Sequence, residues 1–203
     1  MVASVGRSGH QDRVRGRRSQ PGQVRIIGGR WRGRRIDVVD APGLRPTGDR
    51  IRETLFNWLA PWIDGARCLD LFAGTGALGF EAASRGAASV VLVESVGRVA
   101  RSLTETAVTL GADAVQVVNT DARAFLEGAD ASFSIVFVDP PFDADLHADM
   151  LPRVAAAVAP GGLMYVEAPR ATMIELPAGF RWLRDKEAGD VRFGLLERAA
   201  DGG

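Results

Sequence analysis

The sequence contains 203 residues, 46% of them hydrophobic, which suits one globular domain with a sizeable core. A single cysteine excludes an internal disulfide, and two histidines are too few for the usual zinc sites, so we expect no bound metal. Because no apolar run nears ~18 residues and no signal peptide is recognisable, we expect a cytoplasmic protein rather than a membrane or exported one.

Positive charge is concentrated at the N-terminal end, although the net charge of the chain is zero. Residues 1–35 hold ten arginines and one acid, which leaves 15 basic and 24 acidic residues for the remainder. The two parts therefore carry +9 and −9, an asymmetry that indicates an anionic partner at the N-terminal end. We expect residues 1–22 to form a basic disordered tail, for which a solubilising role is equally compatible with the composition.

Two β-rich runs, 24–29 and 34–39, follow this tail and predict an N-terminal hairpin extension over residues 23–41. The link between the runs contains Arg30, Trp31, Arg32 and Arg34. Guanidinium groups pair with phosphates and an indole ring can stack on a base, so these four residues are candidate RNA contacts. The alternative is that Trp31 only packs the hairpin onto the rest of the protein.

Residues 42–59 predict an amphipathic helix with Thr47 or Asp49 as its N-cap. The apolar positions share one face: Ile51, Leu55, Trp58 and Leu59. Three arginines gather near the start of the helix and away from this face: Arg45, Arg50 and Arg52. The helix dipole disfavours cations at this end, and a bound phosphate would offset that, so the three arginines are further candidate RNA contacts.

From residue 67 apolar runs alternate with helical patterns, and we assign residues 42–203 to one α/β domain. Strands are predicted at 67–72, 89–94, 114–118, 134–138 and 162–168, and two more flank Gly189. Helices are expected at 76–86, up to Leu110, at 122–128 and up to about Ala159. The runs alternate little, which indicates strands buried on both faces. The pattern therefore predicts a mostly parallel, doubly wound seven-stranded sheet with an antiparallel edge.

Ligands of such sheets bind at the carboxyl ends of the strands, where the strand order reverses. The segment DLFAGTGALG (70–79) contains a GxGxxG motif between a strand and a helix, which lets the backbone approach a ligand closely. Glu94 could accept hydrogen bonds from ribose hydroxyls, and Asp121 could meet an adenine amine. Candidate cofactor-binding residues are Asp70, Phe72, Ala73, Gly74, Gly76, Glu94, Ser95, Asp121 and Ala122. We expect Glu81, on the next helix, to play a supporting role.

The fourth strand of the sheet runs directly into Asp139-Pro140-Pro141-Phe142. Asp-Pro is common in turns, but a second proline and an aromatic ring add nothing to turn formation. A nicotinamide dehydrogenase would share the glycine motif, yet it has no use for this corner, and Asp70 would repel a pyrophosphate. Asp70 instead suits a ligand with a positive end, such as the amino and sulfonium groups of S-adenosylmethionine.

The combination of DLFAGTG, a VE strand end and DPPF resembles the class I methyltransferases that act on exocyclic amines of bases. With RIIGGRWRGRRI, GLRPTGDRIRETLFNWL and CLDLFAGTGALGFEAASRGA, residues 23–198 resemble the RsmD family of bacterial 16S rRNA guanine-N2 methyltransferases. The resemblance implies a Rossmann-like fold, S-adenosylmethionine as cofactor, and 16S rRNA or the assembling 30S subunit as partner. We expect a monomer. The N-terminal 22 residues and Val96, where many members carry a second acid, depart from the family pattern.

This resemblance gives the Asp-Pro-Pro-Phe corner a chemical role. Asp139 would accept one N–H of the target amine and the Pro140 carbonyl the other, Pro141 would stiffen the corner, and Phe142 would stack on the base. An adenine-N6 DNA methyltransferase would use the same corner, usually with a larger recognition region. A non-catalytic rRNA-binding assembly factor would need only the arginines. Both remain alternatives.

Overall fold

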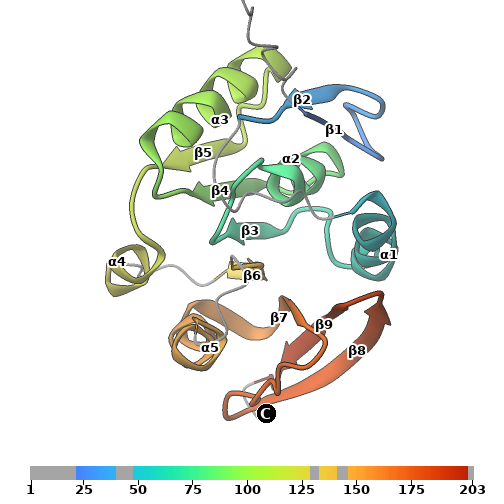
Figure 1. Cartoon of the computed structure of the whole chain (residues 1–203), viewed down its shortest axis with the longest axis vertical. Coiled ribbons are helices and arrows are strands. Elements are labelled where there is room, and N and C mark those ends of the chain that lie inside the picture. Colours follow the sequence, from blue (N-terminus) through green and yellow to red (C-terminus); the bar gives the residue numbers. More distant parts are fainter. Residues whose placement is uncertain (1–21, 40–47, 129–132, 141–145, 201–203) are drawn as a thin grey trace, which may run out of the picture.

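The computed structural model describes residues 22–39, 48–128, 133–140 and 146–200 and contains a central seven-stranded sheet (Figure 1). In spatial order the strands are β5 (Val115–Val118), β4 (Ser89–Val93), β3 (Arg67–Asp70), β6 (Phe133–Val138), β7 (Val158–Pro169), β9 (Val191–Arg198) and β8 (Phe180–Ala188). The strands from β5 to β7 run parallel, whereas β9 pairs antiparallel with both β7 and β8. The predicted mostly parallel sheet with an antiparallel edge is confirmed.

The strand order reverses between β3 and β6. From β3 the chain moves outward through β4 to β5, and then returns to the other side of β3 with β6. Parallel pairing aligns Asp70 at the end of β3 with Leu92 on β4 and with Phe137 on β6. The loops that follow these three strands therefore leave the same edge of the sheet side by side.

Helices cover both faces of the sheet (Figure 1). They are α1 (Asp49–Leu59), α2 (Ala77–Ser84), α3 (Gly97–Leu110), α4 (Ala122–Glu127) and α5 (Leu146–Ala157). Buried side chains of α1, α2 and α3 share one hydrophobic cluster, and those of α4 and α5 belong to a second cluster on the opposite face. In the described segments no helix is both long and apolar enough to cross a membrane.

The N-terminal hairpin consists of β1 (Gln23–Arg25) and β2 (Arg35–Asp37), which are shorter than the predicted runs. Its loop lies against the end of α2. Gly29 has a φ of 71°, and a Cβ there would lie 1.8 Å from the Ser84 carbonyl oxygen, so the position requires glycine. The division of the chain into a tail, a hairpin extension and a main domain stays a prediction.

Trp31 packs the hairpin onto the main domain, as the alternative reading of the sequence proposed. Its side chain is 7% exposed and belongs to the same hydrophobic cluster as α2 and α3, together with Ile26 and Ile36. Its backbone N–H donates to the Ser84 hydroxyl at 2.9 Å. The prediction that Trp31 stacks on an RNA base is therefore contradicted by its burial.

Helix α1 begins within one residue of the start that either predicted N-cap indicates. Gly48 occupies the N-cap position without a side-chain hydrogen bond, and Asp49 is the first helical residue, so the predicted capping by Asp49 is wrong. Thr47 lies outside the described residues. Asp49 instead binds the guanidinium of Arg52 at 2.7 Å, and Arg25 lies 3.8 Å from the same carboxylate.

Arg52 lies on the buried face of α1, although the sequence analysis placed it on another face. Its side chain is 0% exposed, and its Nη2 donates to the Arg25 carbonyl at 2.9 Å. It shares the buried face with Leu55, Phe56 and Leu59, at helical spacing. A side chain enclosed in this way has no access to a phosphate, so the prediction that Arg52 contacts RNA is wrong.

Glu81 of α2 is the buried acid that faces Arg52. The two side chains are both 0% exposed, and Arg52 Nη1 lies 3.8 Å from Glu81 Oε2. The Glu81 carboxylate also accepts hydrogen bonds from the Ile27 and Gly28 backbone N–H groups at 2.7 and 2.8 Å and from Arg85 Nε at 2.6 Å. Glu81 therefore joins the hairpin, α1 and α2, in agreement with its predicted supporting role.

Replacing Glu81 with alanine should destabilise the fold, because it leaves two hairpin amides without their acceptor and the buried Arg52 without a nearby negative charge. We expect a loss of about 3–5 kcal/mol in the free energy of unfolding, measured by urea denaturation. Glu105→Ala on the exposed surface of α3 is the control and should change that free energy by less than ~0.5 kcal/mol. Equal effects of the two substitutions would contradict the role of Glu81.

Candidate active site at the carboxyl edge of the sheet

The glycine loop between β3 and α2 is closed by backbone hydrogen bonds. The Ala73 N–H donates to the Val93 carbonyl at 2.9 Å, and the Gly76 N–H donates to the Ala73 carbonyl at 2.6 Å. Gly76 has a φ of 73°, and a Cβ there would lie 2.7 Å from the side chains of Leu103 and Phe80. Only glycine fits this conformation and this space, which explains the motif at the start of α2.

Glu94 connects the glycine loop to the loop after β4. Its Oε2 accepts from the Gly74 N–H at 3.0 Å, and its Oε1 accepts from the Val96 N–H at 2.7 Å. Each oxygen has a second lone pair, so the carboxylate can also accept hydroxyl groups of a ligand. Sequence patterns miss Asn119, whose Nδ2 donates to the carbonyls of Glu94 and Ser95 at 2.7 and 3.1 Å and so fixes this turn.

Asp121 follows β5 and caps α4. Its Oδ1 accepts from the Arg123 backbone N–H at 2.8 Å. The Asp121 side chain is exposed, whereas the neighbouring Ala122 is buried. Because the cap uses one carboxylate oxygen, the predicted contact with an adenine amine remains a prediction for the other oxygen.

Asp70 is buried at the end of β3. It is 2% exposed, and its Oδ2 accepts from the Gly79 N–H at 3.0 Å. Burial raises the pKa of this carboxyl to about 7, the negative charges of Asp139 and Glu94 act in the same direction, and the Gly79 hydrogen bond opposes them. A positively charged ligand at this edge would favour the ionised form of Asp70. Phe72, two residues further along the loop, is half-buried.

Asp139 and Pro140 follow β6 at the same edge. Asp139 is half-buried and Pro140 is buried. Asp139 follows β6, which lies between β3 and β7 in the sheet, and its charge contributes to the raised pKa values of Asp70 and Glu167. Pro141 and Phe142 lie outside the described residues, so their roles remain predictions.

Sequence patterns also miss Glu167 on β7. It is 5% exposed, and its Oε2 accepts from the Tyr165 hydroxyl at 2.7 Å. The signal that could have found it is an acid inside the otherwise apolar run 162–168. Among the described residues, no three His, Cys, Asp or Glu side chains come close enough together to hold a metal ion.

Exposed arginines surround the hairpin. The predicted contacts Arg30, Arg32, Arg34 and Arg50 are all exposed, and Arg45 lies outside the described residues. Arg25 and Arg35 face each other across the hairpin in register and are exposed as well. Strand alternation places these two residues on the outer face of the hairpin, so the sequence pattern could have identified them.

Comparison with known proteins gives consistent matches along the chain. Residues 24–197 match the family model described as Conserved hypothetical protein 95. The chain is 47% identical over 187 residues to the ribosomal RNA small subunit methyltransferase D of Escherichia coli K12, which covers 91% of this chain and 94% of that relative. The protein of the same name from Haemophilus influenzae is 40% identical, over 87% of this chain and 94% of that relative.

A solved structure agrees with these sequence matches. The structure of Escherichia coli yhhF matches with a TM-score of 0.83 and 44% identity, and covers 89% of this chain and 100% of that chain. The likeness therefore extends over most of this chain and the whole of the other. In agreement with its resemblance to the RsmD family, this chain belongs to the family described as Conserved hypothetical protein 95.

Proposed function

We propose that this protein transfers a methyl group from S-adenosylmethionine to small-subunit rRNA, and that the acceptor is the exocyclic N2 amine of a guanine. The observation that carries the proposal is the position of Asp139, which follows β6 at the edge of the sheet where the glycine loop follows β3 and Glu94 follows β4. Relatives named as rRNA small subunit methyltransferases support this activity. The guanine assignment rests on the resemblance to the RsmD family.

The residues at this edge fit S-adenosylmethionine, which supplies an electrophilic methyl group on a positively charged sulfur. Glu94 would accept the ribose hydroxyls, and the loop from Gly74 to Gly76 allows close approach of a ligand. Asp121 would meet the adenine amine. The carboxyl of Asp70, with its pKa raised by burial to about 7, gains from a positively charged neighbour.

Asp139 would hold the target amine. The lone pair of a guanine amine is delocalised into the ring, so the nitrogen must become pyramidal before it can attack. A carboxylate that accepts one N–H and a Pro140 carbonyl that accepts the other would fix the nitrogen with its lone pair toward the methyl carbon. As the N–C bond forms, positive charge develops on the nitrogen, and the Asp139 carboxylate stabilises it.

The exposed arginines of the hairpin would hold the RNA backbone. Arg30, Arg32 and Arg34 lie in the hairpin loop or next to it, and Arg25 and Arg35 project from its strands. Because the hairpin is fastened to α2, these charges are fixed in place relative to the glycine loop at the start of the same helix. A rigid set of cations can orient a folded RNA toward the Asp139 corner.

Asp139→Ala should nearly abolish methyl transfer, because it removes the acceptor of the target amine. We expect a single-turnover rate lower by a factor of about 100–1,000, measured as transfer of labelled methyl to small-subunit rRNA from cells that lack the enzyme. Binding of S-adenosylhomocysteine should remain largely intact. The control is Asp113→Ala in the exposed loop before β5, with an unchanged rate. A wild-type rate in the Asp139 variant would refute the assigned role.

Replacing Arg30, Arg32 and Arg34 together with alanine should weaken RNA binding and flatten its salt dependence. For single-stranded contacts, the slope of log affinity against log salt should fall in magnitude by about 2. A matched control removes three exposed arginines near the opposite edge of the sheet: Arg170, Arg181 and Arg184. If both triple variants showed the same slope, the hairpin would not be the RNA-binding surface.

A further inference from the structure

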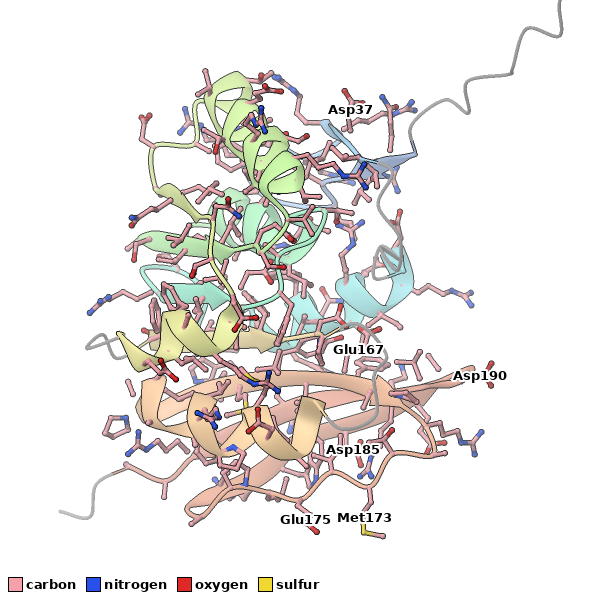
Figure 2. The ribbon with its side chains drawn as sticks, turned by 60° about the vertical axis from the view of Figure 1, so that its left-hand side comes forward. Asp37, Glu167, Met173, Glu175, Asp185 and Asp190 are labelled. Atoms are coloured by element: carbon pink, nitrogen blue, oxygen red, sulfur yellow. The ribbon has the colours of Figure 1, made fainter. Side chains whose placement is uncertain are left out.

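Glu167 is a buried acid beside the Asp139 corner that the proposed mechanism leaves without a role. It lies near the carboxyl end of β7 and is 5% exposed. Figure 2 shows it near the middle of the view, whereas Asp190 lies at the edge of the molecule. A buried carboxyl group is costly when charged, so its retention at this place calls for a function.

The register of the sheet brings Glu167 next to Asp139. Phe137 pairs with Tyr165 and Val138 pairs with Val166 on the parallel strands β6 and β7, so Asp139 and Glu167 are the next residues on each strand. Strand alternation directs both toward the face of the sheet that Phe137 and Tyr165 occupy. The Tyr165 hydroxyl holds the Glu167 carboxyl at 2.7 Å.

The charged groups around Glu167 are mostly acidic. Asp139 faces it from β6, and Asp70 of β3 lies beyond Asp139. On β9 the opposite residue is Phe193, onto which Trp58 of α1 stacks. The neighbouring Arg192 is bound to Asp185 through two hydrogen bonds of 3.0 and 2.6 Å. Among the residues that the structure describes, the charges of Glu167 and Asp139 therefore act on each other.

We propose that Glu167 is a positioning residue for methyl transfer: its carboxylate adds a second negative charge behind Asp139 and strengthens the hold of Asp139 on the amine as that amine becomes positive. The proposal rests on the proposed role of Asp139. In the reaction, the nitrogen lone pair forms the N–C bond, and the electron pair of the C–S bond goes to sulfur. One N–H proton then passes to Asp139 and on to water. Glu167 acts through Asp139 and undergoes no covalent change.

The charge of Glu167 should depend on pH near neutrality. Burial raises its pKa to about 7, the charge of Asp139 adds to that effect, and the Tyr165 hydrogen bond opposes it. Glu167 is therefore mostly neutral below about pH 7 and becomes negatively charged as the pH rises through that value. The rate of the wild-type protein should therefore rise with pH across this range.

Glu167→Gln tests the proposal, because glutamine keeps the shape and cannot ionise. If the charge of Glu167 raises the rate about tenfold, equivalent to one pKa unit of interaction, single-turnover rates of wild type and variant on unmethylated small-subunit rRNA should differ by about twofold at pH 6 and about ninefold at pH 8. A ratio that is constant between pH 6 and pH 8 would overturn the proposal, since a loss of structure does not vary with the ionisation of this side chain. Asp190→Asn, at the β8–β9 turn, is the matched control and should behave as wild type at each pH.

Tyr165→Phe provides a second test that leaves Glu167 in place. Loss of the hydroxyl donor removes a group that stabilises the charged form of Glu167, so the rise in rate should move to higher pH. An unchanged or lower position of the rise would overturn the proposal. The two proposals can fail separately. An active Asp139→Ala variant would refute the role of Asp139. An inactive Asp139→Ala variant, together with a ratio of wild-type to Glu167→Gln rates that does not change with pH, would refute the role of Glu167 alone.

Discussion

The parallel pairing of β3 with β4 on one side and β6 on the other is the constraint on which the site depends. It fixes Asp70 opposite Leu92 and Phe137, so the loops after the three strands begin at one level. The loop after β3 contributes its glycine backbone, the loop after β4 contributes Glu94, and the loop after β6 contributes Asp139. Because the strands are buried on both faces, their register cannot slip without exposing the core. The fixed register in turn fixes the positions at which the three loops of the site begin.

A second constraint is the buried charge between the hairpin and the sheet. Helix α2 begins at the glycine loop, and its later residues Glu81 and Ser84 hold the backbone of residues 27–31. The same helix therefore carries the glycine loop at one end and the hairpin at the other. Among the described atoms, Arg52 Nε and Nη1 find no hydrogen-bond acceptor. The burial of that guanidinium is compensated by the Nη2 contacts with Asp49 and the Arg25 carbonyl, and by the Glu81 charge 3.8 Å from Nη1. The two proposed functions, cofactor binding and RNA binding, would thus share one rigid support.

The central sheet could be predicted from the sequence because long apolar runs leave few alternatives to strands buried on both faces. The glycine loop and the Asp139 corner could be located for a related reason, since polar residues at the ends of such runs must meet at one edge. Arg52 shows where this reasoning fails. Charge alone favours an exposed position, but the spacing with Leu55, Phe56 and Leu59 places Arg52 on the buried face, and its partner Glu81 is distant in sequence. Only the tertiary structure shows that pairing.

Glu167 stands out in the sequence as an acid inside an apolar run, but its link to Asp139, which follows the neighbouring strand and lies 28 positions earlier in the chain, does not. The burial of Trp31 likewise depends on the end of α2, which no local pattern reveals. The central claim is that the corner after β6 faces the methyl donor, and the most direct test is a crystal structure of this chain with S-adenosylhomocysteine. The account predicts the ligand sulfur within about 8 Å of the Asp139 carboxylate, the span of one N–H contact and one methyl transfer. A sulfur bound away from this edge of the sheet would contradict it.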